Sequence, residues 1–246
     1  MNEKPTLVLL HGHGLSPLIW DGLSAALSGD YTIMRPDFSR MTRHTTVEAY
    51  AEELFSMLAA SQITRCVLIG HSMGGYVALA LAAAHPDMVA GLVLFNSTAF
   101  ADPDTDEQRE KRRTAQEILE TDGSEPFVTK SVASMFSTPN QQKRADLVQQ
   151  VIEAHKTLPA EALLTGLQAI RTRPDRSDLL VNASFPVLIL AGRHDSAIPY
   201  EQSQALKSKL PHAQLVMLES SGHLGMLEEP EAAVEAVREF LRMSDK

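Results

Sequence analysis

A serine inside a glycine-rich segment is the feature of this sequence that most directly suggests chemistry. Ser72 lies in residues 70–75, Gly-His-Ser-Met-Gly-Gly, which fit the pattern Gly-x-Ser-x-Gly and follow a short aliphatic run. In that pattern a sharp turn from a strand into a helix presents the hydroxyl, and small neighbours let the helix pack closely. Because a serine hydroxyl is a poor nucleophile until a base takes its proton, the hypothesis requires a histidine and a carboxylate elsewhere in the chain.

Asp195 and His223 are the candidates for the carboxylate and the base. Asp195 ends the segment Ala-Gly-Arg-His-Asp after one aliphatic run, and His223 ends Ser-Ser-Gly-His after the next. Loops that follow the strands of an open parallel sheet share one edge, so both side chains are expected near Ser72. Asp195 would fix the tautomer of His223, which would accept the serine proton and deliver it to the leaving group. The competing interpretation is a turn aspartate and a surface histidine.

Acyl transfer also needs N–H donors that already point at the carbonyl oxygen on which negative charge develops. The backbone N–H groups of His13 and Met73 are predicted to form this oxyanion hole. His13 lies in residues 10–14, Leu-His-Gly-His-Gly, whose glycines let the backbone approach closely. A metal site at His11 and His13, or a phosphate loop, is the alternative, but no further ligand cluster follows and the glycines do not match Gly-x-Gly-x-x-Gly. The predicted chemistry needs neither a metal nor an organic cofactor.

The elements that must position these residues are short strands separated by helices. Aliphatic runs without polar alternation are typical of a parallel sheet covered by helices on both faces. Apolar residues recur at helical spacing between the runs, as in residues 47–58, where Thr45 and Glu48 indicate a capping box. The pattern predicts alternating βαβ units. The six predicted strands are Leu7–Leu10, Tyr31–Met34, Val67–Ile69, Leu92–Phe95, Val187–Leu190 and Leu215–Leu218.

Residues 101–180 break this alternation. They contain no convincing strand but several apolar stripes at helical spacing, so we expect a helical cap inserted into a core of residues 1–100 and 181–246. The cap is expected to shape the substrate pocket. The candidates for the pocket lining are Phe127, Met135, Phe136 and Leu167. Packing into the cap's own core is the favoured interpretation of each, because an apolar helical stripe must first bury itself.

The composition of the chain limits the kinds of partner that it can bind. The chain has 246 residues, 44% of them hydrophobic, which is enough for one substantial core. Its net charge of −9 argues against a nucleic-acid surface and favours a small, neutral or apolar partner. The single cysteine, Cys66, cannot form an internal disulfide. No apolar run approaches the roughly 18 residues of a membrane span, and the run after Pro5 is too short for a signal peptide, so we expect no membrane partner and a cytoplasmic location.

These motifs together resemble the α/β-hydrolase superfamily, especially its small cap-bearing esterases, enol-lactonases and carboxylesterases related to BioH of the biotin pathway. The resemblance covers nearly the whole chain and implies an α/β-hydrolase fold with a helical cap between the family's sixth and seventh strands, where residues 101–180 fall. It also implies a serine esterase that works through an acyl-enzyme. The matching segments are 11–14 with Trp20 and Asp21 for the oxyanion loop, 70–75 for the nucleophile turn, 192–199 for the acid loop and 221–223 for the base loop.

The sequence departs from its relatives in two places. Relatives usually begin with an antiparallel strand pair, which this chain lacks before its first run, so we expect a shortened sheet of six parallel strands. Residues 35–41, Arg-Pro-Asp-Phe-Ser-Arg-Met, stand where relatives carry a glycine-rich loop, so the pocket is expected to differ near Ser39. Some relatives place the acid after the preceding strand, but residues 95–97, Phe-Asn-Ser, offer no carboxylate there.

The leading prediction is hydrolysis of a small carboxylic ester through an acyl-enzyme. Lactone, thioester, carbon–carbon bond and cofactor-free haloperoxidase substrates stay open, because the same three residues serve several chemistries on this scaffold. A ligand-sensing role is a different class of answer, since the fold includes the stress-signalling RsbQ group. The sequence sets neither the natural substrate nor the oligomeric state.

Overall fold

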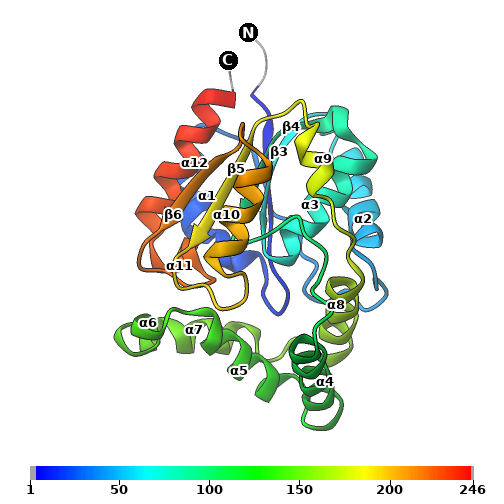
Figure 1. The fold of residues 1–246 in the computed structure, drawn as a ribbon, viewed down its shortest axis with the longest axis vertical. Coiled ribbons are helices and arrows are strands. Elements are labelled where there is room, and N and C mark those ends of the chain that lie inside the picture. Colours follow the sequence, from blue (N-terminus) through cyan, green and yellow to red (C-terminus); the bar gives the residue numbers. More distant parts are fainter. Residues whose placement is uncertain (1–3, 245–246) are drawn as a thin grey trace.

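The computed structural model describes residues 4–244 and contains a six-stranded sheet whose strands all run parallel (Figure 1). The strand order is β2-β1-β3-β4-β5-β6. Each predicted run contributes a strand and the described residues form no antiparallel pair, so the predicted sheet of six parallel strands is confirmed. The strands are β1 (Thr6–Leu10), β2 (Ile33–Met34), β3 (Cys66–His71), β4 (Val89–Phe95), β5 (Val187–Gly192) and β6 (Gln214–Leu218).

Helices cover both faces of the sheet, which explains why the strands lack polar alternation. In β1, Leu7 and Leu9 pack into the apolar cluster on one face, and Val8 and Leu10 pack into the cluster on the other. The first face carries α1 (Asp21–Leu27), α11 (Gly225–Glu228), α12 (Pro230–Ser244) and the short 3-10 helix Pro17–Trp20. The second face carries α2 (Val47–Ala60), α3 (Met73–Ala84), α9 (Ser177–Val181) and α10 (Tyr200–Lys209), and a second 3-10 helix, Pro86–Met88, precedes β4.

The start of α2 corrects one sequence prediction. The helix begins at Val47, and its N-cap is Thr46, whose hydroxyl accepts a hydrogen bond from the Ala49 N–H at 3.2 Å. The capping box predicted from Thr45 and Glu48 is therefore wrong. Two adjacent threonines offer the same cap chemistry, and the packing of the apolar stripe sets which one is used.

Six helices lie between β4 and β5 in the chain, and the first five of them stand beyond the carboxyl edge of the sheet, at the bottom of Figure 1. They fall within the predicted cap, whose boundaries as a separate domain stay a prediction. The last helix of that interval, α9, packs beside α10 on the core. No helix of residues 4–244 is both long and apolar enough to cross a membrane. The five helices are α4 (Asp106–Thr121), α5 (Ser124–Met135), α6 (Thr138–Lys143), α7 (Ala145–His155) and α8 (Ala160–Thr172).

Candidate active site

Ser72 stands at the turn between β3 and α3 in a conformation that few residues with a side chain adopt. Its backbone angles are φ 50° and ψ −119°. Such a conformation costs about 1–3 kcal/mol and persists only where the surroundings impose it. The Ser72 N–H donates to the Phe95 carbonyl at 3.1 Å, and the Ser97 hydroxyl donates to the Ser72 carbonyl at 2.8 Å. The end of β4 therefore holds the turn in place.

The glycines after Ser72 allow two backbones to touch. A Cβ on Gly74 would lie 2.3 Å from the Leu10 carbonyl oxygen, and a Cβ on Gly75 would lie 2.2 Å from the Ser97 hydroxyl. Neither contact is sterically possible, so any larger residue would push α3 away from β1 or β4. Small residues at these positions keep Ser72 close to the loop that follows β1.

Asp195 and His223 form a buried pair at the carboxyl edge of the sheet. His223 Nδ1 donates to Asp195 Oδ2 at 2.8 Å, and both side chains are almost completely buried. The second oxygen, Oδ1, accepts the N–H groups of Ala197 and Ile198 at 2.8 and 2.9 Å. Burial alone would raise the pKa of the Asp195 carboxyl, but the His223 charge and these hydrogen bonds outweigh it and leave the pKa below its usual value. The carboxylate thus stays ionised and fixes the proton of His223 on Nδ1, which leaves Nε2 as the basic nitrogen.

His71, the residue before Ser72, ties the nucleophile turn to the base loop. Its Nε2 donates to the His223 carbonyl at 2.8 Å, and the two rings lie 4.7 Å apart between centroids. Burial lowers the pKa of His71 to about 3, so the ring is neutral at ordinary pH. Among residues 4–244, the Ser72 hydroxyl and His223 Nε2 have no hydrogen bond to each other or to another side chain. The structure thus joins Asp195 to His223 and brings the loop that carries His223 to the turn at Ser72. Proton transfer between Ser72 and His223 belongs to the functional proposal.

His13 and Met73 line one small cavity of about 20 Å³ beside the turn at Ser72. Ser39, from the loop of residues 35–41 that differs from the relatives, lines it too. The His13 side chain points into the cap, where Nε2 donates to the Leu163 carbonyl at 2.8 Å. Burial lowers its pKa to about 4. The ring of His13 thus anchors α8, which leaves its backbone for the predicted oxyanion role.

Ser72 itself lines a larger cavity of about 410 Å³ between core and cap. Sequence reasoning placed four apolar cap residues around the pocket, and none of them is among the residues that line this cavity. Phe127 packs edge-on against His13 at 5.8 Å, Phe136 is buried, and Met135 and Leu167 pack against the same apolar cluster. Their role in substrate binding stays a prediction.

Comparison with known proteins places this geometry in a family. A model of the alpha/beta hydrolase family matches residues 7–237. The chain belongs to the alpha/beta hydrolase family.

Named relatives of this alpha/beta hydrolase match it over nearly its whole length. The putative carbamate hydrolase RutD of Pseudomonas syringae pv. syringae (strain B728a) is 30% identical over 253 residues, covering 97% of this chain and 94% of that protein. A pimeloyl-[acyl-carrier protein] methyl ester esterase of Yersinia enterocolitica serotype O:8 is 28% identical, with the same coverage of 97% and 94%.

Solved structures agree with the fold. A thermophilic esterase from Thermogutta terrifontis, described with malate bound, superposes with a TM-score of 0.89 at 28% identity, covering 98% of this chain and 91% of that one. The enol-lactonase from Burkholderia xenovorans LB400 gives a TM-score of 0.88 at 22% identity, covering 98% and 92%, and supports the fold alone.

The structure of this hydrolase adds two supporting residues that sequence reasoning missed. Asn96 Nδ2 donates to Asp195 Oδ2 at 2.9 Å and to the Gly222 carbonyl at 3.1 Å, so one amide group joins the acid loop to the base loop. In the sequence, residues 95–97 stand out only as a possible place for the acid, which their lack of a carboxylate excludes. The second residue, Glu228, accepts the Gly222 N–H through Oε1 at 2.8 Å and the Ser137 N–H through Oε2 at 2.9 Å. Nothing in the local sequence marks its partners.

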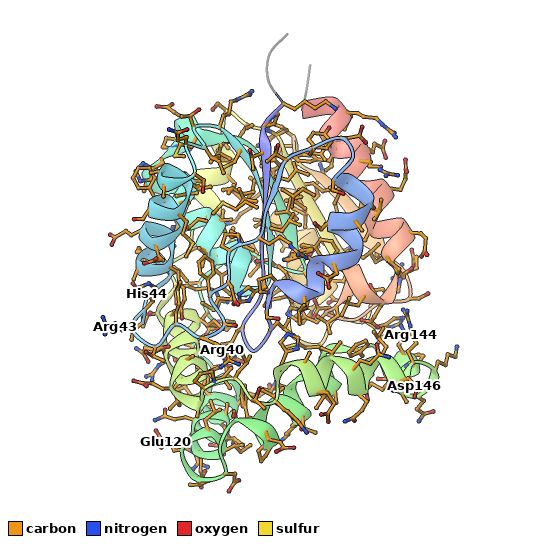
Figure 2. The ribbon with its side chains drawn as sticks, turned by 180° about the vertical axis from the view of Figure 1, so that it is seen from behind. Arg40, Arg43, His44, Glu120, Arg144 and Asp146 are labelled. Atoms are coloured by element: carbon orange, nitrogen blue, oxygen red, sulfur yellow. The ribbon has the colours of Figure 1, made fainter. Side chains whose placement is uncertain are left out.

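Glu228 also belongs to a larger contact between the base loop and the cap of the hydrolase. Asn140 Nδ2 donates to the same Oε2 at 2.8 Å, and the His223 N–H donates to the Met135 carbonyl at 2.6 Å. Arg144, at the start of α7, lies on the side of the cap that faces the core (Figure 2) and donates to the Leu227 and Glu228 carbonyls at 2.8 Å. The cap half formed by α5 to α7 is therefore held directly against the loop that carries His223.

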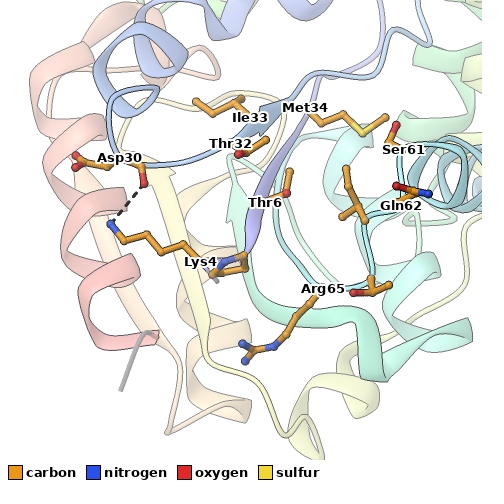
Figure 3. Close-up of a pocket in the computed structure, with 12 residues that line it drawn as sticks. Lys4, Thr6, Asp30, Thr32, Ile33, Met34, Ser61, Gln62 and Arg65 are labelled. Carbon is orange, nitrogen blue, oxygen red and sulfur yellow. Dashed lines mark hydrogen bonds between the residues drawn. The ribbon is translucent and has the colours of Figure 1, made fainter. Parts of the chain in front are cut away.

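A further cavity of about 660 Å³ lies at the amino edge of β1 and β2 (Figure 3). Beside it, the Lys4 amino group donates a hydrogen bond to the Asp30 carbonyl at 3.4 Å. Thr6, Ser61 and Arg65 also line it. It contains none of the proposed catalytic residues, and it lies at the opposite edge of the sheet from them. In an open parallel sheet the chemistry belongs at the carboxyl edge.

Proposed function

We propose that this hydrolase cleaves a small carboxylic ester, with Ser72 as nucleophile, His223 as general base and Asp195 as the carboxylate that orients it. The observation that carries the proposal is the buried hydrogen bond between Asp195 Oδ2 and His223 Nδ1. That bond leaves His223 Nε2 basic, and the His71 contact holds the same loop against the strained turn at Ser72.

The proposed reaction has two steps. In the first, Ser72 Oγ bonds to the ester carbonyl carbon while His223 Nε2 takes its proton, and the N–H groups of His13 and Met73 donate to the oxyanion. The bond to the alcohol oxygen then breaks as His223 returns the proton to the leaving alcohol. In the second, water loses a proton to His223 and attacks the acyl-enzyme, and Ser72 regains its proton as the carboxylic acid leaves.

The relatives support a hydrolytic reaction at a carbonyl joined to a heteroatom, since their names include a methyl ester esterase and a putative carbamate hydrolase. Lactones, thioesters and carbon–carbon bonds next to a carbonyl are alternatives for the same three residues. A panel of an ester, a carbamate, a lactone and a thioester of matched size would rank them by kcat/KM.

Replacing the nucleophile tests the mechanism. Ser72→Ala is expected to lower kcat for a short-chain p-nitrophenyl ester by about 10⁴-fold or more, because the variant lacks the hydroxyl that attacks the ester in this mechanism. A fluorophosphonate probe should label the wild type stoichiometrically and leave the variant unlabelled, as read by intact-protein mass spectrometry. Turnover of the variant at the wild-type rate would overturn the mechanism. Labelling of the wild type without repeated turnover on any member of the panel would instead favour a ligand-sensing role.

A further inference from the structure

A buried arginine lines the same cavity as Ser72. Arg173 follows α8, and its side chain is only 5% exposed. Its guanidinium lies over the ring of Tyr76, with 4.2 Å between Cζ and the ring centroid. Tyr76 lines the cavity too and follows Ser72 by about one turn of α3. A fixed positive charge therefore stands close to the nucleophile.

The guanidinium is anchored on one side and open on the other. Nε donates to the Phe100 carbonyl at 3.1 Å, and Nη1 donates to the Ile170 carbonyl and lies 3.0 Å from Asp102 Oδ1. Within residues 4–244, Nη2 has no hydrogen-bond partner. A nearly buried cation with free N–H groups is poorly solvated, and a carboxylate is the acceptor that matches guanidinium geometry best.

The neighbouring charges leave a positive surplus. Asp102 is shared, because its Oδ2 is paired with Arg112 while its Oδ1 faces Arg173. Burial lowers the pKa of Arg112, and the charges of Arg171 and Arg173 lower it further. Two guanidinium groups, those of Arg112 and Arg173, therefore share the one carboxylate of Asp102. The other charged pair of the cavity, Glu107 with Lys111, is balanced and separated by 2.8 Å.

We propose that Arg173 is a specificity-determining residue that binds a carboxylate carried by the ester substrate. The proposal rests on the function proposed above and narrows its substrate class to small esters with an anionic group, on either the acyl or the alcohol side. It replaces the neutral or apolar partner expected from the net charge of the chain. That charge is summed over the whole surface, whereas the cluster of Arg112, Arg173 and Asp102 beside the cavity at Ser72 carries one positive charge in excess.

Matched pairs of esters test the proposal. Monomethyl succinate against methyl butyrate reports a carboxylate on the acyl side, and acetoxyacetate against ethyl acetate reports one on the alcohol side, with acid release followed in a pH-stat. Wild type is expected to favour the anionic member of at least one pair in kcat/KM. Arg173→Gln should lower kcat/KM for that member by about 10- to 100-fold, as expected for a hydrogen bond to a charged group, and should change the neutral member by less than about threefold. Arg113→Gln is the control, because it removes the same charge from an exposed position on α4 and should change neither.

Binding without turnover separates this inference from the catalytic proposal. Succinate should bind to both wild type and Ser72→Ala in calorimetry, and Arg173→Gln should weaken that binding by about tenfold or more while Arg113→Gln does not. Circular dichroism checks that the variants fold. If Arg173→Gln does not fold, the wild-type ester preference and succinate binding decide the proposal. Absence of succinate binding to wild type, a wild-type preference for the neutral esters, or an equal loss on both members of a pair would overturn it. Succinate binding by a protein that hydrolyses no ester would overturn the proposed reaction and keep the anion site.

Discussion

At the scale of single residues, the amide of Asn96 joins the two loops that carry the acid and the base. The residue has a positive φ of 45°, which glycine and asparagine tolerate best. Asn96→Gly therefore keeps the backbone conformation and removes only the donor to Asp195 Oδ2 and the Gly222 carbonyl. Loss of a buried hydrogen bond to a charged group costs about 1.5–3 kcal/mol, so we expect kcat to fall by about tenfold or more with little change in KM.

Steady-state kinetics on a p-nitrophenyl ester would measure this effect. Asn182→Gly is the control, because Asn182 is exposed at the end of α9, where its amide donates to the Asp178 carbonyl. An Asn96→Gly enzyme as active as the control would show that the amide does not position the acid and base.

The candidate catalytic residues could be predicted because each lies in a short motif directly after a strand. The residues that support them could not. Asn96, Glu228 and Arg173 act on segments far away in the chain, and each stands in an unremarkable local sequence. Only the folded geometry distinguishes Arg173 from its neighbour Arg171, which is exposed.

At the scale of elements, Glu228 connects α11 to the base loop and to the cap. Its carboxylate accepts hydrogen bonds from three N–H groups. In a glutamine, the amide NH₂ would replace one carboxylate oxygen and would face at least one of these donors instead of accepting from it. We expect Glu228→Gln to destabilise the protein by about 1–3 kcal/mol and to lower kcat, because the loop that carries His223 loses an anchor. Thermal unfolding and kinetics would measure both effects.

Glu231→Gln provides the comparison, since Glu231 is exposed in the first turn of α12. Stability that falls without any change in kcat would show that Glu228 serves the fold alone. If neither the free energy of unfolding nor kcat changed, Glu228 would stabilise neither the fold nor the loop that carries His223.

The positions of the strands could be predicted because buried parallel strands are nearly continuous aliphatic runs. The lengths of the strands could be predicted less well. The run Tyr31–Met34 yields a strand of two residues, Ile33–Met34, which pair only with Leu7 and Val8 at the sheet edge. An edge strand has one partner, so its extent depends on that partner's register. The same limit applies to the N-cap of α2, where the sequence offered Thr45 and the fold uses Thr46.

At the scale of the whole molecule, buried neutral histidines make stability depend on pH. Burial lowers the pKa of His71 to about 3 and of His13 to about 4, and it also lowers the pKa of His155. The unfolded chain binds these protons near pH 6.5, so it binds more protons than the folded state between that pH and the lowered pKa values. We therefore expect the free energy of unfolding to fall as pH drops from about 6.5 to about 4, by at most about 1.4 kcal/mol per pH unit for each histidine.

Urea unfolding at a series of pH values would measure this slope. His13→Gln should flatten it, because the glutamine amide can still donate to the Leu163 carbonyl but does not titrate. His212→Gln should leave it unchanged, since His212 is exposed. A free energy of unfolding that stays constant or rises over this range would contradict the expectation.

The conformation of Ser72 has a consequence for how the sequence can change. A glycine at this position would relax the positive φ without steric cost, and it would also remove the hydroxyl. Under the mechanism proposed above, Ser72→Gly would therefore raise thermal stability and abolish turnover. A selection for thermal stability alone would favour this substitution, although it removes the proposed nucleophile.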